Sequence, residues 1–234
     1  MALLRIDYHS KVLELETYIN VVIPDGIELS SSPVVFLLHG LSGNAENWIR
    51  YTSAERYAMD HGVVLVMPEV GRSYYCDMEQ GLDYFTYVTE EIPLFLKRTF
   101  HFSDNYYVFG NSMGGYGALK CYFKRRDLFL GCGAFSAVAD IRYRWDTVHK
   151  KDMSPVMAYP KDEDDIYCLV EKETKDTNLF ITCGLEDQRI DMNRKLVALL
   201  EKKGFSTKVD FRHGIHDWVY WDKALKDALN YFFP

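Results

Sequence analysis

Short, uninterrupted apolar runs recur along this chain, and they constrain its fold more than any other feature. Such a run lacks the alternation of a half-exposed strand, so it is typical of a strand buried on both faces of a sheet. The clearest are Val34–Leu38 (VVFLL), Val63–Met67 (VVLVM) and Tyr106–Phe109 (YYVF). A weaker run at Gly131–Val138 precedes two further strand candidates, Leu179–Cys183 and Thr207–Phe211.

Segments with a helical pattern lie between these runs. In one of them apolar Leu196, Val197 and Leu200 alternate with charged residues, as on an amphipathic helix. The segments are Ala54–His61, Leu82–Arg98, Gly115–Lys124, Met192–Lys203 and Trp218–Phe232. Alternating strands and helices predict an α/β fold with a mostly parallel sheet and helices on both of its faces.

The chain length fits one such domain. The 234 residues, 48% of them hydrophobic, are enough for a single α/β domain over 1–234. Leu3–Tyr8 and Val12–Ile23 are expected to pair as a hairpin ahead of the sheet, before a Pro-Asp-Gly turn at 24–26.

One segment, residues 140–175, interrupts the rhythm. It is charged and irregular, with prolines at positions 155 and 160 and an acidic run at 162–165. Long irregular connections inside compact domains are often functional, so the segment is a candidate cap over an active site. The alternative is a solvated excursion that contains a short helix.

Ser112 lies in a Gly-x-Ser-x-Gly pattern, Gly110-Asn111-Ser112-Met113-Gly114, between a predicted strand and a predicted helix. In this context the pattern indicates a nucleophile elbow, a sharp turn that projects the serine hydroxyl from the sheet edge. Glycines on both sides remove the steric collisions that so tight a turn would cause. Ser112 is therefore the predicted nucleophile.

Two backbone N–H groups are predicted to form an oxyanion hole. That of Met113 follows the nucleophile at the positive end of a helix. The second is expected in the loop HGLSGN (39–44), where Gly40 lets the N–H of Leu41 face Ser112. His39 is expected to brace this loop by hydrogen bonding.

An acid and a base should follow the serine in chain order. Asp187, directly after Leu179–Cys183, is the predicted acid, and Glu186 and Asp191 compete with it because spacing alone does not separate them. His216, before the last helical segment, is the predicted base, with His213 as the alternative.

Composition excludes several other classes. The net charge is −7 and basic residues do not cluster, so nucleic-acid binding is not expected. No signal peptide or membrane-spanning run is visible, and the protein is expected to be cytoplasmic. The 5 cysteines show no CxxC spacing, so neither a disulfide framework nor a metal site is predicted.

The motifs HGLSGNAENW (39–48), MPEVGRSYY (67–75), GNSMGGYGALK (110–120), CGLEDQRID (183–191) and HGIHDWVYW (213–221) resemble the tributyrin esterase-like branch of the esterase D / S-formylglutathione hydrolase family. The resemblance covers nearly the whole chain. It implies an α/β-hydrolase fold, a serine carboxylesterase acting on short acyl esters, and a triad of Ser112, Asp187 and His216. No metal or organic cofactor is implied.

The sequence also departs from S-formylglutathione hydrolases, which usually have serine at the position of His39 and histidine at that of Asn111. A thioesterase or acyltransferase is therefore the alternative function, followed by a non-catalytic binding protein. The expected partner is a small-molecule ester, and assembly into a homo-oligomer stays open. Five loop residues are predicted to line the substrate pocket, with ordinary packing as the alternative: Trp48, Tyr74, Tyr75, Trp145 and Met153.

Overall fold

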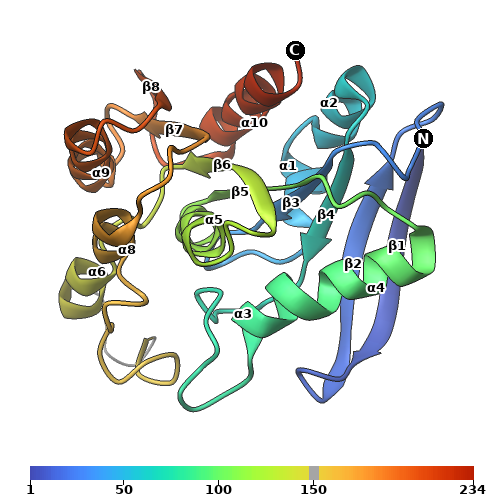
Figure 1. Ribbon diagram of the computed structural model, residues 1–234, viewed down its shortest axis with the longest axis horizontal. Coiled ribbons are helices and arrows are strands. Elements are labelled where there is room, and N and C mark those ends of the chain that lie inside the picture. The colour runs from blue at the N-terminus through green and yellow to red at the C-terminus, as the bar shows by residue number, and fades with distance from the viewer. Residues whose placement is uncertain (148–152) are drawn as a thin grey trace.

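One twisted sheet runs through the molecule in the computed structural model, which describes residues 1–147 and 153–234 (Figure 1). Within these residues its eight strands have the order β1-β2-β4-β3-β5-β6-β7-β8. They are β1 (Ala2–Ser10), β2 (Leu15–Ile23), β3 (Val34–Leu38), β4 (Val64–Pro68), β5 (Tyr106–Asn111), β6 (Phe129–Phe135), β7 (Leu179–Gly184) and β8 (Thr207–Arg212). β2 pairs antiparallel with β1 and with β4, and the remaining pairs are parallel. The predicted hairpin and mostly parallel sheet are confirmed.

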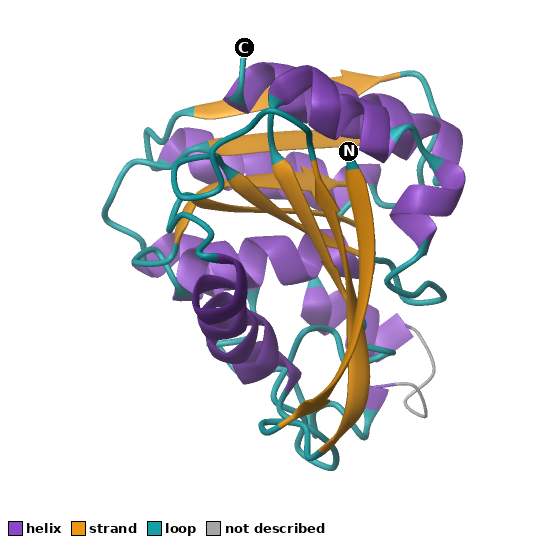
Figure 2. Ribbon diagram, turned by 90° about the vertical axis from the view of Figure 1, so that its right-hand side faces the viewer, coloured by secondary structure: helices purple, strands orange, loops and turns teal. Residues whose placement is uncertain are grey.

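Helices cover both faces of the sheet (Figure 2). α1 (Asn47–Tyr51), α2 (Ala54–His61) and α10 (Trp218–Phe232) share one apolar cluster with the sheet. The other face packs against α4 (Ile92–Phe100), α5 (Met113–Lys124), α6 (Ile141–Thr147), α8 (Ile166–Lys172) and α9 (Ile190–Lys202). Among the described residues, no helix has both the length and the apolar character needed to cross a bilayer.

The uninterrupted apolar runs are explained by burial on both faces. In β3, Val34, Phe36 and Leu38 belong to one apolar cluster, while Val35 and Leu37 belong to the other. Successive side chains of a strand point to opposite faces, so a strand covered on both sides must be apolar at every position.

The helix predicted over 82–98 is divided. A short turn of helix, α3 (Tyr84–Thr86), leads into a π-helical segment, η1 (Tyr87–Glu91), and α4 follows from Ile92. Pro93 is the second residue of α4, directly after the π-helical segment, so a residue that cannot donate an N–H coincides with the change of helix type. Periodicity predicted the helical region, but it carries no signal for a change of helix type.

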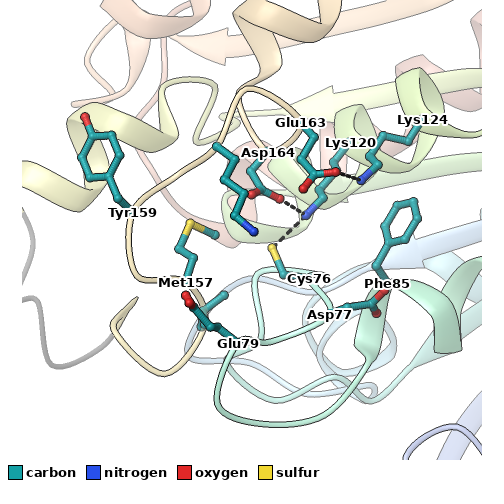
Figure 3. A pocket seen from close by; sticks show the side chains of 12 residues that line it. Cys76, Asp77, Glu79, Phe85, Lys120, Lys124, Met157, Tyr159, Glu163 and Asp164 are labelled. Atoms are coloured by element: carbon teal, nitrogen blue, oxygen red, sulfur yellow. Dashed lines mark hydrogen bonds and ion pairs between the residues drawn. The ribbon is translucent and has the colours of Figure 1, made fainter.

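The segment 140–175 contains α6 and α8, and its residues 148–152 lie outside the described part of the chain. It is fastened to α5, because Lys120 Nζ lies 2.7 Å from Asp164 Oδ1 and the Tyr116 hydroxyl donates to the Asp164 carbonyl. Figure 3 shows Lys120 pointing toward both Asp164 and Cys76, in the wall of a cavity of about 220 Å³. The cap role of the segment remains a prediction.

Gly114→Ala is expected to destabilise the fold by about 3 kcal/mol, because the added methyl group overpacks a rigid contact. A Cβ at Gly114 would lie 2.3 Å from the carbonyl oxygen of Leu38 and 2.8 Å from that of His39. Both obstacles are backbone, so neither can rotate away. Urea denaturation of the wild type and the variant measures the loss.

Gly81→Ala is the matched control, since its nearest neighbours are the flexible thioether end and Cβ of Met78. We expect this change to cost far less. Equal losses from the two substitutions would contradict the steric explanation.

Candidate active site

Ser112 sits at the junction of β5 and α5 in a backbone conformation that few side chains adopt. Its φ of 57° and ψ of −115° are strained for a residue with a Cβ. A Cβ at Gly110 would lie 2.3 Å from the carbonyl oxygen of Gly114, which explains the glycines on both sides of the serine. The turn leaves the Ser112 side chain facing a cleft.

A histidine and a carboxylate lie in line with this serine. His216 Nε2 is 3.1 Å from Ser112 Oγ, and His216 Nδ1 is 2.7 Å from Asp187 Oδ2. Asp187 follows β7 and His216 follows β8, so loops after adjacent parallel strands bring the two together. Since Asp187 accepts from Nδ1, the unprotonated Nε2 can accept the serine proton.

The competing residues form a separate pair on the surface. His213 Nδ1 lies 2.7 Å from Glu186 Oε1, and the other Glu186 oxygen accepts the N–H of Gly214. The His213 side chain is 90% exposed. Asp191 lies on α9, where it pairs with Arg194. The structure therefore brings Asp187 and His216, and not these three competitors, to Ser112.

Asp187 is held in its ionised form. Burial acts to raise its pKa, but the hydrogen bond and charge of His216 and the N–H of Arg189 outweigh burial, and the pKa lies below its ordinary value. Asp187 Oδ1 accepts that N–H at 2.9 Å. An ionised carboxylate at this position stabilises a positively charged His216.

The glycine loop after β3 lies against Ser112. A Cβ at Gly40 would lie 3.5 Å from the Ser112 Cβ and 3.3 Å from Asn111 Nδ2, so a side chain there would crowd the Asn111 amide. Leu41 lines the same cleft as Ser112, and the N–H of Met113 opens α5 directly after the serine.

His39 braces this loop. Its Nδ1 lies 2.8 Å from the Gly40 carbonyl, which can only accept, and its Nε2 accepts the N–H of Val70. His39 is therefore neutral with its proton on Nδ1, and burial lowers its pKa in agreement with this state. The buried Tyr75 hydroxyl donates a hydrogen bond to the His39 carbonyl.

An open cleft of about 620 Å³ surrounds Ser112 and His216. Sequence reasoning missed several of its walls. Trp218 and Trp221 come from α10, and the Trp221 ring meets the His216 ring edge-on at 4.8 Å. Their proximity to His216 in the HDWVYW motif was the available signal. Tyr51 and Arg189, by contrast, carried no distinguishing pattern.

The predicted pocket residues lie in the packed interior, and this corrects their expected place in the cleft wall. All five are at least nine-tenths buried. Trp48 donates to the Leu38 carbonyl and packs against Phe135 and Trp218, while Tyr75 packs against Gly117. The other three are Tyr74, Trp145 and Met153. Loop position indicated exposure, but the side chains are buried, and Tyr74 and Tyr75 also have a positive φ.

Metal ligands were not predicted, and in residues 1–147 and 153–234 no group of three or more His, Cys, Asp or Glu side chains is arranged to hold an ion.

Similar proteins are esterases and serine hydrolases. Residues 10–232 match the family model described as "Putative esterase". An acetyl esterase of Caldicellulosiruptor saccharolyticus is 25% identical in an alignment of 260 residues, gaps included, that covers 99% of this chain and 98% of the relative.

Two solved structures from Staphylococcus aureus share the whole fold. The fluorophosphonate-binding serine hydrolase F, with substrate bound, is 28% identical at a TM-score of 0.90, over 100% of this chain and 98% of that chain. An S-formylglutathione hydrolase is also 28% identical, with a TM-score of 0.89 over 100% and 99% of the two chains. The predicted α/β-hydrolase fold and the predicted relationship to the esterase D / S-formylglutathione hydrolase family are confirmed. The chain belongs to this esterase family and is a carboxylic ester hydrolase.

Proposed function

We propose that the protein hydrolyses short-chain acyl esters, from acetyl to butyryl, through a Ser112–His216–Asp187 triad and an acyl-enzyme intermediate. The observation that carries this proposal is the chain of hydrogen bonds from Asp187 Oδ2 through His216 to Ser112 Oγ, at 2.7 and 3.1 Å. Its nucleophile stands at the mouth of a cleft wide enough for a small substrate. The acetyl esterase relative supports the short acyl group.

Acylation begins when Ser112 Oγ attacks the ester carbonyl carbon and His216 Nε2 takes its proton. Asp187 keeps the His216 ring in the required tautomer and stabilises its charged form. The tetrahedral oxyanion is bound by the N–H groups of Leu41 and Met113. His216 then gives its proton to the leaving alcohol.

Deacylation repeats these steps with water. His216 Nε2 removes a proton from a water molecule, which attacks the acyl carbon, and Ser112 leaves with the proton returned by His216. Because Ser112 carries the acyl group between the two halves, a substrate with a fast leaving group should give a burst of product.

The test is a series of p-nitrophenyl esters from acetate to octanoate. We expect kcat/KM to be highest for acetate to butyrate and to fall for longer chains, with a pre-steady-state burst of p-nitrophenol equal to the enzyme concentration. Stopped-flow absorbance measures both. A profile rising to octanoate would contradict the short-chain assignment, and turnover of every ester without Ser112 acylation would contradict the covalent mechanism.

Thioester hydrolysis is the second candidate, because a structural neighbour that covers the whole chain is an S-formylglutathione hydrolase. The two activities differ in leaving group. Competition between S-formylglutathione and p-nitrophenyl acetate compares the two kcat/KM values directly. We expect the oxygen ester to be preferred, and a preference for the thioester would reverse the assignment.

A further inference from the structure

Arg189 stands in the wall of the cleft that holds Ser112 and His216. It precedes the first residue of α9 and lies in the loop that also supplies Asp187. Its side chain is only 12% exposed. Burying a guanidinium costs free energy unless a counter-charge pairs with it and its N–H groups are hydrogen-bonded. The burial of Arg189 in this cleft therefore calls for an explanation.

The carboxylates of the protein neutralise the charge of Arg189 only in part. The Asp187 oxygen facing Arg189 Nη1 is 4.0 Å away, which is beyond hydrogen-bond distance. Both oxygens of Asp187 are already used, one by His216 Nδ1 and the other by the backbone N–H of Arg189. Among the described residues, Nη1 is buried without a hydrogen-bond partner.

A second cation adds to the positive potential. Arg144, on α6 of the 140–175 segment, donates from Nε to the hydroxyl of Tyr74. Burial lowers the pKa of Arg189, Asp187 opposes this shift, and the charge of Arg144 adds to it. The two arginines are therefore close enough to repel each other.

The cleft wall contains one further carboxylate, which does not neutralise Arg189. Asp217 also lines the cleft, but its side chain caps α10 by accepting the N–H of Tyr220. No ion pair between Asp217 and Arg189 forms in the described part of the chain. The remaining polar walls near Ser112 are neutral: Asn47, Asn111 and the backbone of residues 40–43.

We propose that Arg189 binds a carboxylate carried by the substrate, so that the enzyme prefers anionic esters to neutral esters of the same size. The planar guanidinium fork matches a carboxylate, and a charge-assisted pair in a partly buried cleft is among the stronger hydrogen bonds in proteins. A bound anion would also offset the unmet charge of Arg189. The proposal rests on the ester hydrolysis proposed above and names its substrate class.

Two matched ester pairs test the preference. 4-Acetoxybenzoate and its methyl ester place the charge on the leaving group, while p-nitrophenyl hydrogen succinate and p-nitrophenyl butyrate place it on the acyl group. Each kcat/KM is divided by the rate of alkaline hydrolysis, which removes intrinsic reactivity. We expect wild type to prefer the anionic member of one pair by about tenfold or more, mainly through KM. The pair that responds locates the carboxylate.

In Arg189→Gln, the ratio of kcat/KM for the anionic ester to kcat/KM for the neutral ester should fall to about one. Arg189→Lys should keep part of the anionic preference. Arg194→Gln, on the helix α9 that follows Arg189, is the matched control, since Arg194 is 54% exposed and pairs with Asp191. No anionic preference in wild type would overturn the proposal. So would an Arg189→Gln variant that slows both members of a pair equally, because Arg189 would then act by positioning Asp187.

Binding without catalysis separates this proposal from the proposed function. Calorimetry compares 4-acetamidobenzoate with neutral 4-acetamidobenzamide, neither of which carries an ester. We expect the anion to bind wild type about tenfold more tightly, and the difference to shrink with added salt. If the esters are not hydrolysed but this difference is present, the function fails and the anion site stands. If the esters are hydrolysed and the difference is absent, the anion site fails.

Discussion

Ser112→Ala is expected to lower kcat for p-nitrophenyl acetate by about 10⁶-fold, the scale seen when a triad nucleophile is removed. The substitution deletes the atom that attacks the ester and the group that His216 Nε2 contacts at 3.1 Å. The oxyanion donors and the cleft remain, so a residual rate above the spontaneous reaction should persist. Steady-state kinetics at high enzyme concentration measures this residual rate.

Ser42→Ala is the matched control, because Ser42 lines the same cleft and offers a hydroxyl on the glycine loop. We expect this variant to keep wild-type turnover within a few-fold. Circular dichroism establishes that both variants are folded. If Ser112→Ala kept about a hundredth of the wild-type kcat or more, another group would have to be the nucleophile.

Asp187→Asn is expected to lower kcat by about 10⁴-fold, although the two side chains have nearly the same shape. The carboxylate accepts from His216 Nδ1 at 2.7 Å and so leaves Nε2 free of a proton. An asparagine amide can donate to Nδ1 instead, which moves the ring proton to Nε2. In that tautomer His216 faces Ser112 with a donor and cannot act as a base.

The competing acids provide the controls for this experiment. Glu186→Gln and Asp191→Asn alter side chains that are 49% and 93% exposed, and both should leave kcat near the wild-type value. The three variants together measure which carboxylate serves His216. A larger loss from Glu186→Gln than from Asp187→Asn would move the acid and base to the Glu186–His213 pair.

Sequence patterns predicted the framework because they follow from burial and chain order. Val34–Leu38, Ala54–His61 and Trp218–Phe232 have the predicted bounds, since a strand buried on both faces gives an uninterrupted apolar run and an amphipathic helix gives a helical apolar periodicity. The Gly-x-Ser-x-Gly turn was recognisable because side chains do not fit at its glycine positions. A Cβ at Gly110 or Gly114 would lie 2.3 Å from a backbone carbonyl oxygen.

The walls of the cleft were not predictable in the same way. Tyr74 and Tyr75 were expected near the substrate because they lie in a loop, yet both are fully buried. Both residues have a positive φ, and no local sequence signal such as glycine or asparagine predicts this conformation for a tyrosine. In the sequence Arg189 resembles an ordinary surface charge, and only the fold shows that it is largely buried in the wall of the cleft that Ser112 also lines.

The order of strands in the sheet has a consequence for how an active molecule is made. β5, β6, β7 and β8 are neighbours in the sheet in the same order in which they follow along the chain. A ribosome therefore makes the Ser112 turn first, the Asp187 loop after β7, and the His216 loop only after the edge strand β8. On the proposed mechanism, nascent chains hold Ser112 without its base until β8 and the loop that follows it have been made.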